Sequence, residues 1–207
     1  MADNTVRQRD AAEPFGTRRL DLVPLRAGHA EEMAAVLSDP ALHAFIGGSP
    51  DTPQALRSRY RRMTAGSPAP AVSWLNWVIR LRADARLTGT VQATVHANAG
   101  PAAEGPAAEG PGVEGPGVEG HATEGPGVGA VAEVAWMVGT PWQGRGIATE
   151  AARGLVDWLG HRGVRTVIAH IHPDHAASAA VASAAGLRPT DMWQDGEVRW
   201  RGSTTGR

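Results

Sequence analysis

The chain has 207 residues, 42% of them apolar, which is enough for one globular domain with its own hydrophobic core. It contains no cysteine, and this excludes disulfides, thiolate metal sites and a cysteine nucleophile. The formal net charge is −1, but residues 98–129 carry five glutamates and no arginine, so the remainder has a net charge of +4. That excess suits a polyanionic cofactor and is too small to indicate a nucleic-acid partner.

The ends of the chain and its hydropathy predict how it is organised. No run approaches the roughly 18–20 consecutive apolar residues of a membrane span, and residues 1–17 lack the apolar core of a secretory signal. We therefore expect no membrane partner and a cytoplasmic protein. We predict a flexible leader over residues 1–17, a single domain over residues 18–200, and a flexible tail over residues 201–207.

The first half of the chain predicts a strand, two helices and a β-hairpin. In order, these elements span residues 19–26, 28–39, 52–63, 72–81 and 87–96. Pro40 ends the first helix, and Thr52 with Pro53 supplies the N-cap and first residue of the second. The last two segments are rich in β-branched and aromatic residues and are separated by a polar turn, which is typical of a hairpin.

A repeat interrupts the chain after this hairpin. From Glu104 onward glutamate recurs every five residues in segments such as EGPAA and EGPGV. A period of five fits neither a helix nor a strand, and glycine and proline leave little apolar surface to offset the entropy of ordering. We predict a disordered insertion at residues 98–129 between two strands, tolerated because loop closure costs little more for a long loop. An interaction or elastic motif is the alternative.

The second half predicts alternating strands and helices. These comprise strands at 131–138 and 165–171, helices at 147–161 and 173–185, and a closing hairpin of strands at 187–193 and 197–200. We expect Asp174 to be the N-cap of the second helix and Gly186 its left-handed stop. Asp195 and Gly196 form a favourable turn pair for the hairpin.

The turn between the strand at 131–138 and the next helix has the character of an anion site. Gly144 and Gly146 allow the backbone to approach a ligand, and the helix N-terminus adds unpaired N–H groups and the positive end of its dipole. Such a turn binds pyrophosphate. It is not a Walker A loop, since the chain has no lysine, and Thr149 breaks the G-x-G-x-x-G pattern. A tight turn without a ligand is the alternative.

This region resembles a known family. The stretch AEVAWMVGTPWQGRGIATEA is similar to the acetyl-CoA site of the GNAT superfamily of N-acetyltransferases, with Gln143, Gly146 and Ala148 on its motif. RRLDLVPL, LSDPALHAFIGG and HAASAAVASAAGLRP resemble the RimJ/RimL-like branch, over about residues 18–190. The resemblance implies an α+β (mixed α/β) fold, with a mostly antiparallel seven-stranded sheet, helices on both faces, and a splay between strands 4 and 5.

The resemblance also implies a reaction. The chain would move an acetyl group from acetyl-CoA, as cosubstrate, to a primary amine by direct attack in a ternary complex, and the lack of cysteine fits a route without an acyl-enzyme. The acceptor would be a small molecule or a protein N-terminus, and a homodimer is one possible assembly. The alternative function is a non-catalytic acyl-CoA-binding or regulatory domain.

Cofactor contacts follow from the resemblance. Backbone N–H groups of the loop would hold the CoA pyrophosphate, the preceding strand end would pair with the pantetheine arm, and a free N–H there would stabilise the oxyanion. His175 stands where the branch usually has asparagine. The implied cofactor-binding residues are Met137, Val138, Gln143, Gly144, Arg145, Gly146, Ile147, Ala148, Thr149, His175 and Ser178.

Three residues are candidates for the chemistry. Glu133 matches the glutamate of the branch's strand and is the first choice for the base that accepts the amine proton; a surface glutamate is the alternative. His172 is the second choice. Tyr60, the only tyrosine, lies in an early helix, so protonation of the CoA thiolate would pass to Ser178 or water.

Histidines and tryptophans complete the candidates. His170, His172 and Asp174 have a spacing that suggests a metal site, but Asp174 is better explained as an N-cap, so we expect no metal and two histidines that line the acceptor cleft. Trp74 and Asn76 share one strand face, where they could meet an acceptor, although core packing is the favoured role of Trp74.

Overall fold

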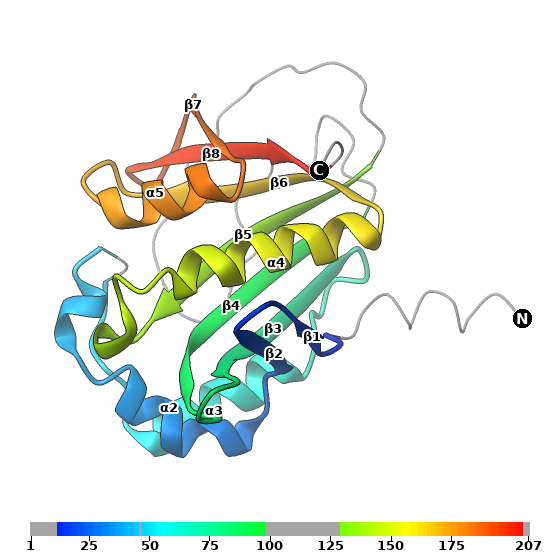
Figure 1. Cartoon of the computed structure of the whole chain (residues 1–207). Helices are drawn as coiled ribbons and strands as arrows, with labels where there is room; N and C mark the ends of the chain where they lie inside the picture. The colour runs from blue at the N-terminus through cyan, green and yellow to red at the C-terminus, as the bar shows by residue number, and fades with distance from the viewer. Residues whose placement is uncertain (1–11, 46, 98–128, 205–207) are drawn as a thin grey trace, which may run out of the picture.

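The structure is a computed structural model that describes residues 12–45, 47–97 and 129–204 (Figure 1). Its strands are β1 (Phe15–Gly16), β2 (Leu20–Pro24), β3 (Val72–Leu81), β4 (Leu87–His96), β5 (Ala130–Val138), β6 (Val164–Ile171), β7 (Arg188–Gln194) and β8 (Glu197–Ser203). Its helices are α2 (Ala30–Val36), α3 (Pro53–Thr64), α4 (Ile147–His161) and α5 (Ala176–Ala184), with short 3-10 helices η1 (Ala27–His29), η2 (Pro40–His43) and η3 (Thr140–Trp142). The insertion predicted at residues 98–129 lies outside the described residues apart from its last one.

The strands form one sheet in the order β1-β2-β3-β4-β5-β6-β8-β7. Every neighbouring pair is antiparallel except β5 and β6, which run parallel. The predicted mixed and mostly antiparallel sheet is therefore confirmed. It has eight strands rather than seven, because the short strand β1 pairs with β2 at its edge.

The predicted leader and tail are both too long. Phe15 lies in β1, and its ring centroid is 5.5 Å from that of Trp77 and 5.8 Å from that of Trp158. The Trp77 indole N–H donates to the carbonyl of Glu13 at 2.8 Å. Residues 12–17 thus belong to the fold, because one aromatic side chain in a polar segment covers the end of the core. At the other end, β8 continues to Ser203.

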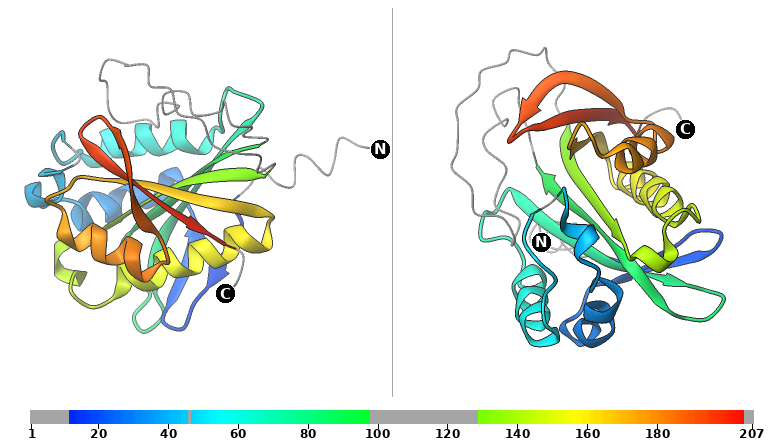
Figure 2. Two further views of the ribbon diagram at one scale, coloured as in Figure 1. Left: turned by 90° about the horizontal axis from the view of Figure 1, so that it is seen from above. Right: turned by 90° about the vertical axis from the view of Figure 1, so that its left-hand side faces the viewer.

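Helices cover both faces of the sheet, as predicted. Figure 2 shows α2 and α3 on one side of the strands, and α4 and α5 on the other. The alternation of side chains along β3 matches this arrangement, since Trp77 and Ile79 belong to the core under α4, whereas Val78 packs with the α2 and α3 side. The predicted inner face of α4 is buried, including Ile147 and Leu155.

Most of the predicted start and stop signals act as expected. Thr52 accepts the N–H of Ala55 at 3.2 Å at the start of α3, and Gly186 has a φ of 87° after α5. The prediction for Asp174 is wrong. His175 occupies the N-cap position of α5 without a side-chain cap, and Asp174 extends into solvent with 83% of its side chain exposed.

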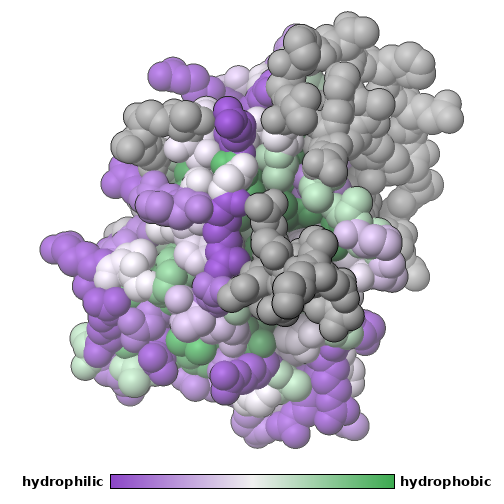
Figure 3. Space-filling view, turned by 90° about the vertical axis from the view of Figure 1, so that its right-hand side faces the viewer, coloured by the Kyte–Doolittle hydropathy of each residue, from purple (hydrophilic) through white to green (hydrophobic). Residues whose placement is uncertain are grey.

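Apolar side chains are largely enclosed. Among the described residues, the large apolar side chains left exposed are Phe45 and Trp193, at 38% and 62%. Figure 3 shows one face of the molecule, on which hydrophobic areas are small and lie between hydrophilic side chains. In the part of the chain that the structure describes, no helix has both the length and the apolar character to cross a membrane.

Candidate active site

The two parallel strands at the centre of the sheet separate partway along their length. β5 pairs with β6 from Ala130 only as far as Glu133, which lies opposite Ile168. β5 nevertheless stays paired with β4 as far as Val138. Residues 134–138 therefore have a strand on one side and, among the described residues, none on the other. The predicted splay is confirmed, and Glu133 sits at the point where it begins.

A glycine turn follows the separated end of β5 and leads into α4. Gly144 and Gly146 have φ values of 70° and 72°, in the left-handed region that favours glycine. The first hydrogen bond of the helix runs from the N–H of Glu150 to the carbonyl of Gly146 at 3.0 Å. The N–H groups of residues 147–149 consequently have no acceptor within the helix. A Cβ at position 144 would meet nothing within 4 Å, so this side of the turn is open.

Side chains hold this turn in place from two directions. Gln143 donates its amide Nε2–H to the carbonyl of Val138 at 2.9 Å, which ties the turn to the end of β5. Arg19, in the segment that precedes β2, donates a hydrogen bond of 3.1 Å to the carbonyl of Arg145. Gln143 was predicted as part of the motif, whereas the contribution of Arg19 was not, because it comes from a position 126 residues away.

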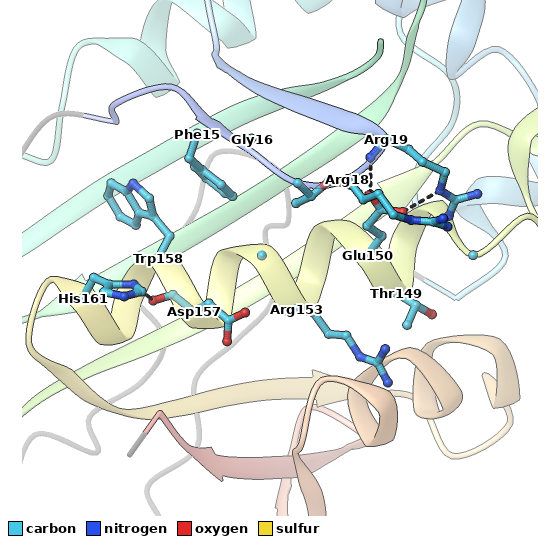
Figure 4. Close-up of a pocket in the computed structure, with 13 residues that line it drawn as sticks. Phe15, Gly16, Arg18, Arg19, Thr149, Glu150, Arg153, Asp157, Trp158 and His161 are labelled. Carbon is cyan, nitrogen blue, oxygen red and sulfur yellow. Dashed lines mark hydrogen bonds and ion pairs between the residues drawn. The ribbon is translucent and has the colours of Figure 1, made fainter. Parts of the chain in front are cut away.

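Glu150 connects the same segment to the start of α4 (Figure 4). Its carboxylate accepts hydrogen bonds from the hydroxyl of Thr17 at 2.6 Å and from the backbone N–H and Nε–H of Arg19 at 2.7 and 2.6 Å. Burial alone would raise the pKa of Glu150, but these hydrogen bonds and the charge of Arg19 outweigh it and hold the pKa below its ordinary range. The carboxylate is therefore charged at neutral pH.

A groove of about 680 Å³ runs from Gly146 along α4. Figure 4 shows Arg18 and Arg19 on one side of it, and Arg153 projecting from the helix toward α5. Arg153 donates its Nε–H to the carbonyl of Ala184 at 2.7 Å. Three guanidinium groups face two acidic residues along this groove, so it carries a net positive charge. Open helix N–H groups beside arginines form a donor set that fits a pyrophosphate.

The opposite face of the sheet carries a second set of predicted residues. Trp74, Thr94 and Glu133 are cross-strand partners on β3, β4 and β5, so their side chains share this face. The Trp74 side chain is half-buried, and its indole nitrogen is buried with no hydrogen-bond partner among the described residues. Asn76 is buried on the same face and donates to the carbonyl of Met63 at 3.4 Å.

Glu133 has a close partner on the neighbouring strand. Its Oε1 lies 2.9 Å from Nδ1 of His170 on β6, and 29% of the Glu133 side chain is exposed against 8% for His170. Burial alone would raise the pKa of Glu133, but the hydrogen bond from His170 and the electrostatic influence of His170, His96 and Arg199 lower it below its ordinary range. Glu133 is thus a carboxylate at neutral pH that remains open to solvent.

The pKa of a second carboxyl group, on β8, is shifted in the opposite direction. Burial raises the pKa of Glu197; the carboxylates of Glu133 and Asp195 act in the same direction, while His170 and His172 lower it. Carboxyl groups whose pKa values are shifted in opposite directions are typical of acid–base sites. No sequence pattern indicated Glu197, because it is the pairing of β8 with β6 that brings this residue to the site.

His172 and His175, which follow β6, contact the ring of Phe45, which follows η2. The ring of Phe45 stacks on His175 with a centroid distance of 4.3 Å and lies 5.4 Å from His172. Nδ1 of His172 accepts the backbone N–H of Asp174 at 3.2 Å. Burial, together with the charge of His172, lowers the pKa of His175. Phe45 belongs to the segment LSDPALHAFIGG, but the sequence did not single it out as a site residue.

The candidate Ser178 and the only tyrosine, Tyr60, which was not a candidate, lie on different helices. Ser178 is half-buried in α5, which packs against α4 and β6. Tyr60 is 2% exposed in the core beneath α2 and α3, where burial raises the pKa of its phenol. Across residues 12–45, 47–97 and 129–204, no three histidine, aspartate or glutamate side chains form a group that could hold a metal ion.

Comparisons with solved structures identify the fold. An acetyltransferase of the GNAT family from Bacillus anthracis superposes with a TM-score of 0.65 at 14% identity, covering 94% of this chain and all of that one. RimL, a ribosomal L7/L12 alpha-N-protein acetyltransferase solved in complex with coenzyme A, gives a TM-score of 0.62 at 14% identity, covering 92% and 98%. AAC(6')-Ib, in complex with paromomycin and acetyl-CoA, gives 0.63 at 13% identity, covering 89% and 93%.

Sequence comparison gives the family. No curated protein sequence matches the chain significantly. A family model described as an acetyltransferase (GNAT) domain matches residues 19–188, which is most of the chain and includes the separated strands, the glycine turn and Glu133. With a family match of this extent and the corresponding fold, the chain belongs to the GNAT acetyltransferase family.

Proposed function

We propose that this chain transfers the acetyl group of acetyl-CoA to an amine by direct attack within a ternary complex. One observation carries the proposal. The separation of β5 from β6 begins at Glu133 and opens toward the glycine turn at the start of α4. This reaction needs a free strand edge that has a turn able to bind pyrophosphate at one end and a carboxylate at the other.

Acetyl-CoA would bind with its pyrophosphate on the N–H groups from Gly144 to Ala148, assisted by the hydroxyl of Thr149. The N–H of Gln143 already donates to the carbonyl of Thr140 at 3.2 Å. The pantetheine arm would lie along Met137 and Val138, whose main chain pairs with no strand of the described structure on the β6 side. An N–H of this free edge would donate to the thioester oxygen and stabilise the oxyanion. The positively charged groove beside α4 would take the nucleotide end.

The chemistry would begin with a neutral amine attacking the thioester carbon. The C–N bond forms, the C–S bond breaks, Glu133 accepts the proton that the amine loses, and the CoA thiolate takes one from Ser178 or water. The hydrogen bonding of His172 supports Glu133 over His172 as the base. Nδ1 of His172 accepts a backbone N–H, so in the neutral imidazole the other nitrogen carries the hydrogen and no lone pair remains to accept a proton.

The test is release of CoA thiol from acetyl-CoA in the presence of a panel of amines. Because RimL acts on a protein N-terminus and AAC(6')-Ib was solved with an aminoglycoside, the panel should include peptides with free N-termini, aminoglycosides and polyamines. Acetylation of one class, lost in Glu133→Gln, is the expected result. Tight binding of acetyl-CoA with no turnover on any amine would instead favour a non-catalytic acyl-CoA-binding domain.

A further inference from the structure

The Glu133 carboxylate is one end of a chain of three side chains. His170 contacts it through Nδ1, 2.9 Å from Oε1. The other imidazole nitrogen, Nε2, lies 3.4 Å from Nε of Arg199. His170 and Arg199 are direct cross-strand partners on β6 and β8, so the sheet register itself brings them together.

The direction of these hydrogen bonds follows from their chemistry. A guanidinium group can only donate, so Nε2 of His170 must accept from Arg199. The hydrogen of the neutral imidazole is then on Nδ1, which donates to the carboxylate of Glu133. The order of donation is therefore Arg199 to His170 to Glu133.

This order decides whether His170 or Glu133 is able to accept a proton. Both nitrogens of His170 are engaged, one as a donor and one as an acceptor, and only 8% of its side chain is exposed. Glu133 has only its Oε1 occupied by His170, while Oε2 receives no hydrogen bond from a described residue. Glu133 is also the more exposed of the pair, so its free oxygen is the one that a substrate can reach.

We propose that His170, oriented by Arg199, is the positioning residue of the Glu133 base. The bond to Oε1 fixes the carboxylate with Oε2 toward the acceptor amine, and it stabilises the charged form that accepts the proton. The proposal rests on the proposed function, in which Glu133 is the base. The lowered pKa of Glu133 agrees with it.

Other charged groups also act on the Glu133 carboxylate, so a test must separate their effects from the effect of His170. His96 on β4 and Arg199 on β8 both favour the charged form of Glu133. The Glu133 carboxylate in turn raises the pKa of Glu197 on β8, whereas His172 lowers it. His96 makes a suitable control, because it contributes to the field at Glu133 without a hydrogen bond to it.

The first experiment follows the carboxyl carbon of Glu133 by NMR across pH in the full chain, with ¹³C-labelled glutamate and Glu133→Gln to assign the signal. In His170→Leu the titration of Glu133 should move to higher pH, because burial then acts without the hydrogen bond. His170→Asn retains a donor near the position of Nδ1, so it should shift the titration of Glu133 less. His96→Leu, which removes no hydrogen bond to Glu133, should also shift this titration less. An unchanged titration in a folded His170→Leu chain would overturn the proposal.

The second experiment measures the kinetics of the same variants with an amine acceptor. His170→Leu should lower kcat about 10-fold to 100-fold, the range that corresponds to a hydrogen bond to a charged group. The KM for acetyl-CoA should stay within about twofold, and the acid limb of kcat/KM, which reports deprotonation of the amine, should stay in place. His170→Asn should restore part of the rate.

The outcomes separate this proposal from the one on which it rests. If Glu133→Gln keeps full activity, Glu133 is not the base and the proposed mechanism fails. If Glu133→Gln is inactive while His170→Leu has the native rate and the native titration of Glu133, the base assignment stands and the positioning role of His170 is wrong.

Discussion

Arg19 donates two hydrogen bonds to a single carboxylate, that of Glu150, from its backbone N–H at 2.7 Å and its Nε–H at 2.6 Å. The hydroxyl of Thr17 adds a third at 2.6 Å. Glu150 lies in the first turn of α4, and its partners lie between β1 and β2. One side chain therefore fastens the edge of the sheet to the helix that starts at the glycine turn, and negative charge at this helix end is favourable in its own right.

Replacing Glu150 with glutamine should lower the free energy of unfolding by about 1–2 kcal/mol at neutral pH, because a neutral amide accepts weaker hydrogen bonds from a guanidinium group. Urea unfolding followed by circular dichroism measures the change. Glu31→Gln is the matched control. Its carboxylate lies 3.4 Å from Arg57 and 77% of its side chain is exposed, so its loss should have little effect. Equal losses in the two variants would contradict the role of Glu150.

The same carboxylate should make stability depend on pH. Burial raises the pKa of Glu150, but its hydrogen-bond partners lower it by more, so the pKa in the folded chain lies below that in the unfolded chain. Such a group contributes stability that is fully present above the unfolded pKa of about 4.3 and is lost as pH falls through the folded value. The gap in stability between the native chain and Glu150→Gln should therefore narrow in acid. Unfolding measured from about pH 7 to about pH 3 checks this, and a constant gap would contradict it.

Gly89 is required by the close approach of β4 to the end of β5. A Cβ at this position would lie 2.1 Å from the carbonyl oxygen of Met137, a backbone atom that cannot move aside cheaply. We expect Gly89→Ala to cost about 3 kcal/mol or more in free energy of unfolding. Gly28→Ala is the control, since a Cβ there would meet nothing within 4 Å. Thermal unfolding of both variants measures the difference, and a stable Gly89→Ala chain would show that this register is not fixed.

The parts of the fold that could be predicted are those in which the local pattern is strong. The hairpin of β3 and β4 and the helix α4 have the bounds expected from their periodicity and turns. β1 was missed because two residues in a polar segment show no alternation, and only packing on Trp77 and Trp158 defines it. The place of β8 between β6 and β7 also depends on tertiary pairing, which a closing hairpin does not specify.

The candidate site, like the fold, was predictable where its residues are contiguous in sequence and not where tertiary pairing brings them together. The glycine turn was predicted because it is contiguous in sequence, and its positive φ values follow from the glycines themselves. The contact between Glu133 and His170 was not, although both residues had been singled out. It depends on the parallel register that places Glu133 opposite Ile168. Arg199 and Phe45 were missed for the same reason, since strand pairing and a loop bring them in from distant positions.

Gly146→Asp should abolish acetyl-CoA binding in a chain that stays folded. Aspartate tolerates the left-handed conformation that this position requires, but its carboxylate would lie where the pyrophosphate must bind, and opposing like charges cost several kcal/mol. We expect a loss of affinity of roughly 100-fold or more by calorimetry. Gly146→Asn has nearly the same shape without the charge and should lose less. Unchanged affinity in folded Gly146→Asp would remove the turn from the cofactor site.

The EGPxx repeat should contribute little to stability or cofactor binding. We expect that replacing residues 104–127 with a short Gly-Ser linker leaves the thermal midpoint and the acetyl-CoA affinity nearly unchanged, because the segment has too little apolar surface to form a core. Calorimetry on the two chains measures both quantities. A clear loss of either would mean that the repeat docks onto the domain.

The last prediction separates Glu133 from His172 as the base. With its pKa below the ordinary range, Glu133 is ionised throughout the neutral range, so the pH dependence of kcat/KM should mainly report deprotonation of the amine. A histidine base of ordinary pKa would add a second limb near pH about 6.5. Glu133→Gln should lower kcat by roughly 10²–10⁴-fold with little change in acetyl-CoA affinity.

His172→Ala should have a milder effect, because Nδ1 of His172 accepts the backbone N–H of Asp174 and its neutral form has no free lone pair. The measurement is kcat/KM across pH for the native chain and both variants with the acceptor that the amine panel identifies. If Glu133→Gln keeps nearly full activity while His172→Ala loses it, the histidine must release its backbone contact to act as the base. A limb near pH about 6.5 in the native profile, absent from that of His172→Ala, would then confirm the exchange of roles.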